Sequence, residues 1–216
     1  MKILNLYAGI GGNRKLWGNE HEITAIEINL EIAEIYQDFF PNDKVIVTDA
    51  HQYLLEHFKE YNFIWSSPPC SSHSFVRKIT YQQNKPIFPY MKLYEEILFL
   101  QGYFKGKYVV ENVIGWYEPL VKPQEISNHY FWANFTISLI KAKYRAHNEL
   151  NSVLEKRKGF DLSGYSLTED KKKILRNCVE PEVGLHILNE SSKKQQRNVG
   201  DFLSPKGESL IAINQN

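Results

Sequence analysis

Short apolar runs alternate with segments of helical periodicity through roughly the first 115 residues of the chain. The apolar runs predict β-strands at 3–7, 22–27, 44–48, 62–66 and 107–111. The helical spacing predicts a helix that begins at 13–17 and further helices at 30–40, 51–61 and 90–104. This alternation indicates an α/β fold with a doubly wound, mostly parallel sheet, whose ligands bind beyond the carboxyl ends of the strands.

The alternation is lost after residue 140. Residues 141–190 are polar and turn-rich, and the segment 191–216 begins with a polar, basic run. We therefore predict a large domain at 1–140, a small appendage at 141–190 and a C-terminal segment at 191–216 that returns to the core of the large domain.

Composition and cysteine content limit the class of protein. Hydrophobic residues make up 43% of the 216 residues and charged residues 24%, as in folded globular proteins. No apolar run approaches the roughly 18 residues that span a bilayer, so we expect no membrane contact and a cytoplasmic location. Cys70 and Cys178 are too few for a disulfide scaffold or a cysteine-rich zinc site. Both are expected to be free thiols, with Cys178 structural.

Charge is distributed unevenly along the chain, although the net charge is only +1. Residues 1–140 carry 12 Lys or Arg against 15 Asp or Glu, whereas residues 141–216 carry 14 against 10. A basic C-terminal third suits a surface that faces a polyanion such as nucleic acid, but so small a shift also arises by chance.

Three features predict a pocket for an adenosine-bearing cofactor. Gly9-Ile10-Gly11-Gly12 forms a turn between a strand and a predicted helix, where backbone can approach a ligand and the helix N-terminus adds positive charge. Glu27 ends the next strand 18 residues after Gly9, a spacing suited to an acid that binds a ribose hydroxyl pair. Asp49 ends the third strand and either accepts from an adenine amino group or caps the following helix. A glycine turn alone is as often structural.

Ser67-Pro68-Pro69-Cys70 follows the fourth strand, where two prolines stiffen the loop and present one thiol at the mouth of this pocket. A buried, inert cysteine is the usual alternative. A loop that leads towards a helix start is expected to lower the pKa of Cys70 and make it a nucleophile.

Val110-Glu111-Asn112-Val113 closes the fifth strand with an acid and an amide at the same edge of the sheet. A carboxyl group in a partly apolar pocket can hold a proton, as a general acid acting on a ring nitrogen must. A helix cap by Asn112 and a solvated Glu111 are the alternatives for this segment taken alone.

The ordered set of motifs resembles the cytosine-C5 DNA methyltransferase family over most of the chain. Leu6 to Gly12 is similar to the family's first motif, Pro68-Pro69-Cys70 to its nucleophile loop and Glu111-Asn112-Val113 to its ENV signature. Arg197-Asn198-Val199-Gly200 resembles a degraded form of its last motif. The resemblance implies the methyltransferase fold, with S-adenosylmethionine bound by Tyr7, Ala8, Gly9, Gly11, Gly12, Glu27, Ile28, Asp49, Ala50 and Pro68.

The resemblance also implies a mechanism and partners. A cytosine flips out of double-stranded DNA, Cys70 attacks C6, Glu111 supports protonation at N3, Asn112 orders the nucleophile loop, and no metal takes part. The 141–190 appendage would recognise the target and 191–216 would pack beside the cofactor. A monomer is expected, and a companion restriction endonuclease is a candidate partner. Candidate DNA contacts are Ser72, Arg77, His129, Arg145 and Arg176.

One departure from the family concerns its Gln-x-Arg-x-Arg motif, which is expected after the ENV strand. This chain has the segment 127–132, Ser-Asn-His-Tyr-Phe-Trp, and so lacks the arginine that would contact the cytosine O2. His129 or Arg145 could replace it, or the aromatic run is only a core strand.

Three other functions remain open on the sequence. Some relatives methylate transfer RNA with the same cysteine, and a catalytically impaired DNA-binding relative would also lack the arginine. Amino-group DNA methyltransferases use a Ser-Pro-Pro segment that Ser67-Pro68-Pro69 fits, but Cys70 stands where they carry an aromatic residue, and the ENV signature has no role there.

Overall fold

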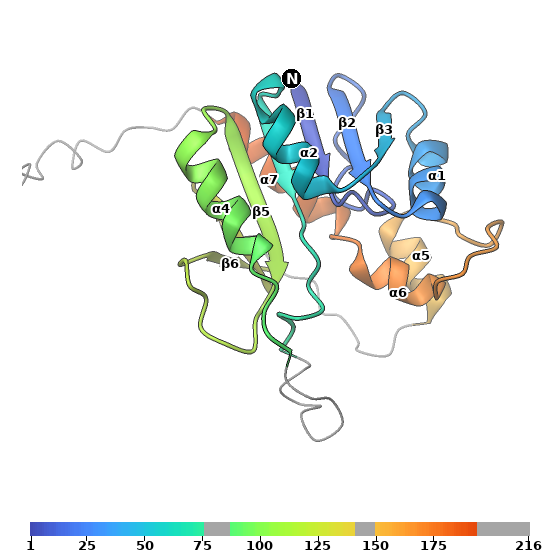
Figure 1. Ribbon diagram of the computed structural model, residues 1–216. Coiled ribbons are helices and arrows are strands. Elements are labelled where there is room, and N and C mark those ends of the chain that lie inside the picture. The colour runs from blue at the N-terminus through green and yellow to red at the C-terminus, as the bar shows by residue number, and fades with distance from the viewer. Residues whose placement is uncertain (76–86, 141–149, 194–216) are drawn as a thin grey trace, which may run out of the picture.

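The computed structural model describes residues 1–75, 87–140 and 150–193. Its centre is a sheet with the strand order β3-β2-β1-β4-β5-β7-β6 (Figure 1). The first five strands in this order are parallel, and β7 runs antiparallel to both of its neighbours. The strands are β1 (Lys2–Leu6), β2 (Glu22–Glu27), β3 (Lys44–Val47), β4 (Phe63–Ser66), β5 (Lys107–Val113), β6 (Gln124–Ile126) and β7 (His129–Ala133). The predicted doubly wound, mostly parallel sheet is confirmed.

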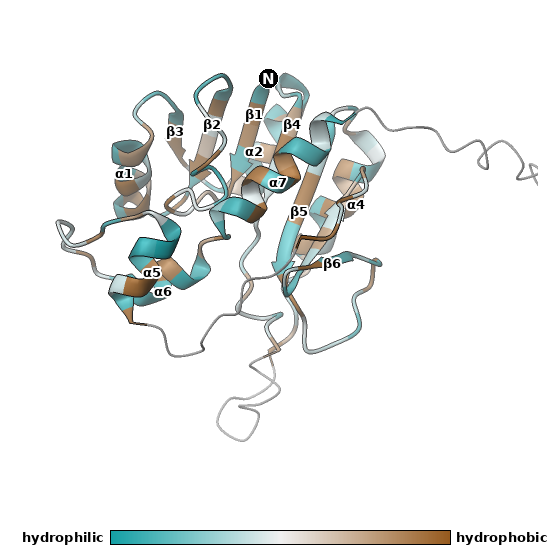
Figure 2. Ribbon diagram, turned by 180° about the vertical axis from the view of Figure 1, so that it is seen from behind, coloured by the Kyte–Doolittle hydropathy of each residue, from teal (hydrophilic) through white to brown (hydrophobic). Residues whose placement is uncertain are grey.

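Helices cover both faces of the sheet, which explains why β1, β4 and β5 are almost continuously buried. On one face, α2 (Ala50–His57) and α4 (Lys92–Tyr103) bury Leu54 and Ile97 against Leu4 and Ile64. On the other face, α7 (Pro181–Ser192) packs Ile187 against residues of β1 and β4 (Figure 2). Alternate residues of each strand thus serve two cores.

The helix predicted to begin at 13–17 is wrong. This segment forms turns, in which Lys15 N–H donates to the Gly12 carbonyl at 3.4 Å and Trp17 N–H to the Arg14 carbonyl at 3.0 Å. Gly18 is left-handed at φ 77° and ends the segment after five residues. A Cβ on Gly184 of α7 would lie 2.2 Å from the Asn13 carbonyl oxygen. The backbone of α7 therefore packs directly against this turn.

Charged and polar side chains fix the same turn from within the core. Arg14 is 3% exposed and its Nε donates to Asp43 Oδ2 at 2.8 Å, while Tyr36 Oη donates to the same oxygen at 2.8 Å. Asn13 Nδ2 donates to Asn5 Oδ1 at 2.7 Å. Asn13 and Arg14, in the segment predicted as a helix, therefore form side-chain hydrogen bonds with distant residues.

The described C-terminal part contributes to two regions. The helices α5 (Asn151–Lys158) and α6 (Lys171–Asn177) pack on α1 (Leu30–Phe39) through Phe160, Leu162 and Leu175. Although α7 begins inside the 141–190 range predicted as an appendage, it packs on the sheet. The Arg197–Gly200 motif lies outside the described residues. None of the helices within the described ranges is both long and apolar enough to cross a bilayer.

Candidate active site

A cavity of about 340 Å³ lies beyond the carboxyl ends of the parallel strands. Its volume falls within the range of small-molecule sites. It is lined by the loop after β1, the end of β2, the loop after β4, the end of β5, the start of β7 and the segment from α6 to α7. The structure thus brings together Tyr7, Ala8, Gly9, Gly12, Glu27, Ile28, Pro68, Cys70, Glu111, Asn112, His129 and Arg176, all of which were predicted as site residues.

The glycine turn after β1 is shaped by close backbone contacts. Gly11 has a φ of 85°, and a Cβ there would lie 2.4 Å from the Phe40 ring. A Cβ on Gly12 would lie 2.6 Å from the Val179 carbonyl oxygen. Glycine is therefore required at both positions. Because turns follow in place of a helix, the helix N-terminus predicted to add positive charge here is absent.

Glu27 connects this turn to the end of β2. Its Oε2 accepts from Gly9 N–H at 2.9 Å, and its Oε1 accepts from Asn29 N–H at 3.0 Å. An ionised carboxylate has about four acceptor sites, so two stay available for a pair of ligand hydroxyls. Glu27 is therefore both a structural link and a suitable ribose ligand.

Three of the predicted cofactor residues do not line this cavity: Gly11, Asp49 and Ala50. Asp49 caps α2, because its Oδ1 accepts from Gln52 N–H at 2.8 Å. This is the capping role that the sequence allowed. Ala50 is buried in the core beneath it.

The nucleophile loop is tied to β5 by the amide of Asn112. Its Nδ2 donates to the Pro68 carbonyl at 3.0 Å, and its Oδ1 accepts from Val113 N–H at 3.0 Å. At the root of the loop, Trp65 Nε1 donates to Ser67 Oγ at 2.9 Å. The Asn112 amide thus links β5 to the nucleophile loop, and Cys70 lies half-buried at the cavity wall.

The prediction that the setting lowers the pKa of Cys70 is wrong. Burial raises this pKa, and the nearby negative charge of Glu111 raises it further. The Lys173 charge and a backbone hydrogen bond act in the opposite direction but are smaller. In the described residues 71–75 that follow the loop, the chain forms turns and not a helix, with His73 N–H and Ser74 N–H both donating to the Cys70 carbonyl at 3.0 Å.

His129 lies beside Glu111 because β6 and β7 form a tight hairpin. Ser127 and Asn128 both have positive φ, 53° and 64°, as in a two-residue hairpin turn. His129 therefore starts β7 opposite Val113, and its Nε2 lies 3.7 Å from Glu111 Oε1. Glu111 is 7% exposed. The two sequence interpretations of this run are compatible, because Phe131 and Trp132 are core residues while His129 lines the cavity.

The tautomer of His129 limits what it can donate. Its Nδ1 lies 3.2 Å from the Ser127 carbonyl oxygen, which can only accept, so Nδ1 carries a proton in this contact. A neutral ring then offers Nε2 as an acceptor. His129 can donate from Nε2 into the cavity only as an imidazolium ion.

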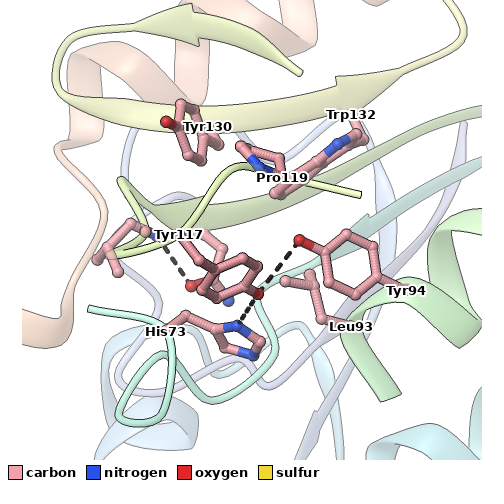
Figure 3. A pocket seen from close by; sticks show the side chains of 10 residues that line it. His73, Leu93, Tyr94, Tyr117, Pro119, Tyr130 and Trp132 are labelled. Carbon is pink, nitrogen blue, oxygen red and sulfur yellow. Dashed lines mark hydrogen bonds between the residues drawn. The ribbon is translucent and has the colours of Figure 1, made fainter. Parts of the chain in front are cut away.

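Aromatic side chains support the nucleophile loop from behind, around a second cavity of about 10 Å³ (Figure 3). The Tyr94 hydroxyl donates to the Tyr117 hydroxyl at 3.2 Å, and the Tyr117 hydroxyl lies 2.6 Å from His73 Nδ1. Burial lowers the pKa of His73, so its neutral ring accepts from Tyr117. This series of hydrogen bonds connects α4 to the loop after Cys70 and restricts the movement of that loop.

Two predicted DNA contacts differ in their surroundings. Ser72 is buried, does not line the large cavity, and its hydroxyl oxygen accepts from Tyr90 N–H at 3.0 Å. Arg176 is exposed and lines the cavity. Arg77 and Arg145 lie outside the described residues.

Residues before α7 form a wall of the cavity that the sequence did not predict. Glu169, Asn177, Cys178 and Val179 all line it. Cys178 packs against Gly12, and burial raises the pKa of its thiol to about 12. Periodicity gives no signal for this wall, since its residues reach the cavity through the packing of α6 on α1 and of α7 on the sheet.

The strand order and the cavity at the strand ends define the fold of an S-adenosylmethionine-dependent methyltransferase. The sequence model of the C-5 cytosine-specific DNA methylase family matches residues 1–150, and the chain belongs to this family. S-adenosylmethionine is accordingly the cofactor indicated for it. The site fits this cofactor, since the close-packed glycine turn and the remaining acceptor sites of Glu27 face one cavity.

Three solved structures illustrate the sequence identity and coverage of the similar proteins. A triple-substitution variant of DNMT2 from Spodoptera frugiperda is 28% identical, with a TM-score of 0.36 over 52% of this chain and 35% of that chain. A hypothetical protein from Thermus thermophilus is 15% identical, with a TM-score of 0.44 over 61% and 73%. A putative DNA modification methyltransferase from an Escherichia coli prophage is 19% identical, with a TM-score of 0.36 over 55% and 33%. This chain thus spans about a third of the DNMT2 chain. The comparison with curated proteins found no match.

Replacing Glu27 by alanine should weaken S-adenosylmethionine binding by about 1.5–3 kcal/mol, the usual loss for hydrogen bonds to a charged group. The carboxylate would no longer hold Gly9 N–H or meet the ribose hydroxyls. Titration calorimetry measures the change, with Glu31→Ala on α1 as a control in the same part of the chain. An unchanged dissociation constant for Glu27→Ala would contradict the assignment.

Proposed function

We propose that the protein transfers a methyl group from S-adenosylmethionine to carbon 5 of cytosine in double-stranded DNA, through a covalent adduct with Cys70. The observation that carries the proposal is the sharing of one cavity by two sets of side chains. The glycine turn follows β1, and Glu27 ends β2. Cys70 lies in the loop after β4, while Glu111 and His129 belong to β5 and β7. A cofactor and a base bound over these strand ends would meet between them.

The proposed reaction begins when the Cys70 thiolate forms a bond to C6 of the ring. The Glu111 carboxyl group supports protonation at N3, so the electron pair displaced from C6 gathers at C5. S-adenosylmethionine, when bound, supplies a methyl group already activated by the sulfonium. After C5 has taken the methyl group, loss of the C5 proton and release of Cys70 restore the aromatic ring.

The position of Cys70 supports base flipping as part of the proposal. Cys70 is half-buried at the cavity wall, and Glu111 is more deeply buried at 7% exposure. A cytosine stacked in a duplex presents its edges and not its C6 face, so it has to leave the stack to reach Sγ. We expect the flipped ring to lie between the nucleophile loop and the His129 side of the cavity.

Replacing His129 by alanine should slow methyl transfer by about one to two orders of magnitude, the cost of leaving the buried cytosine O2 without a donor. His129 is a described side chain beside Glu111 that can supply this donor, as an imidazolium ion through Nε2. Single-turnover rates on duplex DNA measure the effect, and His129→Gln, which keeps an N–H donor, should recover part of it. Unchanged turnover in His129→Ala would leave this residue as the start of a core strand only.

Methyl incorporation from labelled S-adenosylmethionine into duplex DNA and, separately, into transfer RNA tests the proposed substrate. The proposal expects label in DNA, recovered as 5-methylcytosine after hydrolysis. Label in transfer RNA alone would replace DNA by RNA, whereas N4-methylcytosine or N6-methyladenine would overturn the role of Cys70. We expect a monomer in these assays, and the companion endonuclease remains a prediction.

A further inference from the structure

Glu96 is a fully buried carboxylate in the middle of α4, outside every motif of the sequence and outside the lining of the large cavity. Its relative exposure is 0%. A buried charge is costly unless hydrogen bonds satisfy it, so its partners indicate why it is there. Glu96 accepts from three side chains of three different elements.

Two of the three partners are hydroxyl groups at the roots of the two functional loops. Tyr7 Oη donates to Glu96 Oε1 at 2.6 Å, and Ser66 Oγ donates to Oε2 at 2.5 Å. Tyr7 begins the glycine turn with a strained φ of 54°, and Ser66 directly precedes the Ser67–Cys70 loop. One carboxylate therefore holds the ends of β1 and β4, which are neighbours in the sheet.

The third partner is the imidazole of His51 on α2. His51 Nδ1 lies 3.1 Å from Glu96 Oε1, and its Nε2 lies 3.6 Å from Glu95 Oε2. The hydrogen bond to Glu96 raises the pKa of His51, while burial and the Lys92 charge act against it. Burial and the Glu96 charge raise the pKa of Tyr7, which keeps its hydroxyl protonated as a donor. The cluster is thus a set of donors around one acceptor.

We propose that Glu96 is a positioning residue that couples the cofactor turn to the nucleophile loop by holding Tyr7 and Ser66 with a single carboxylate. It touches neither the cofactor nor the base, and acts through the two loop roots. The cofactor half of the proposal rests on the cavity and the family, and only the nucleophile half rests on the proposed function. Each half has its own measurement.

Glu96→Gln tests the coupling, because glutamine has nearly the same shape but only one accepting oxygen for three donors. Losing the charge from these contacts should raise the S-adenosylmethionine dissociation constant about tenfold and slow trapping on DNA that contains 5-fluorocytosine about tenfold. Glu95→Gln is the matched control. It removes the same charge from the adjacent residue, whose side chain is 60% exposed, and should leave both values unchanged.

Two further variants test the contact to the cofactor turn and the contact to the nucleophile loop separately. They keep the test valid if Glu96→Gln folds poorly. Tyr7→Phe should weaken cofactor binding and Ser66→Ala should slow trapping, each about three- to tenfold, the loss of one hydrogen bond. In the Glu96→Gln background neither change should add to the effect.

The outcomes distinguish this proposal from the proposed function. Additive effects, or a Glu96→Gln protein altered in melting temperature alone with binding and trapping within about twofold, would overturn the coupling. Wild-type protein that binds S-adenosylmethionine but traps no DNA would instead defeat the proposed function. In that case the calorimetric effect of Glu96→Gln and Tyr7→Phe still decides the cofactor half.

Discussion

Replacing Cys70 with serine should abolish both methyl transfer and covalent trapping on DNA that contains 5-fluorocytosine. Fluorine cannot leave C5 as the proton does, so a competent thiolate forms a permanent adduct after methylation. The serine hydroxyl is not ionised at neutral pH and is a much weaker nucleophile than a thiolate. Cofactor binding should change little, because Glu27 and the glycine turn are untouched.

The control for this experiment is Cys178→Ser, which removes the other free thiol. Cys178 packs against Gly12, and burial holds its thiol protonated, so the variant should still form the trapped species. A denaturing gel of enzyme and fluorinated DNA reports the adduct directly. Trapping by Cys70→Ser, or its loss in Cys178→Ser alone, would remove Cys70 from the mechanism.

The pH dependence of trapping checks the same assignment. Burial and the Glu111 charge raise the pKa of Cys70, so the thiolate fraction of the free enzyme grows only above the usual thiol range. The trapping rate measured at low DNA concentration should therefore rise with pH through neutrality. Lys173→Met should move the profile to higher pH, because the Lys173 charge lowers the Cys70 pKa. A rate independent of pH would contradict an attack by this thiolate.

The sequence predicted the strand ends well because the signals there are local. The apolar run 22–27 matches β2 residue for residue, and the predicted run 62–66 contains β4. Once parallel strands are known, their carboxyl ends meet at one edge, which places Glu27, Cys70 and Glu111 around one cavity. Functional residues at strand ends therefore need no knowledge of side-chain packing.

The remaining features depend on contacts between distant residues. The 13–17 segment has helical spacing, but it forms turns. Arg14 pairs with Asp43, and the backbone of α7 packs closely against Asn13. The pKa of Cys70 is raised, whereas the sequence predicted that it would be lowered. The sequence of the loop does not indicate how deeply the thiol is buried or that Glu111 lies nearby. The sequence does not distinguish Glu96 from the other acids of its amphipathic helix, because its three hydrogen-bond donors come from distant parts of the chain.

Replacing Glu111 with glutamine should lower the rate of methyl transfer by about two to four orders of magnitude, the contribution of a positioned general acid. Glutamine keeps the shape of the side chain but cannot deliver a proton to N3, so C6 remains a poor electrophile. The dissociation constant for S-adenosylmethionine should change little, because Glu111 belongs to β5 and the glycine turn to β1. Single-turnover methylation and calorimetry measure the two quantities separately.

A second readout excludes a merely structural loss in this variant. The Glu111 charge raises the pKa of Cys70, so Glu111→Gln should move the residual trapping profile to lower pH even as its maximum falls. Glu118→Gln, at an exposed position in the loop after β5, removes a charge of the same kind and should change neither the rate nor the profile.

Replacing His129 by alanine should slow methyl transfer much less in the Glu111→Gln background than in the wild type, since the two side chains lie 3.7 Å apart and act on the same ring. Normal turnover by Glu111→Gln, or a fall in rate explained by weaker cofactor binding alone, would move the proton donor away from Glu111.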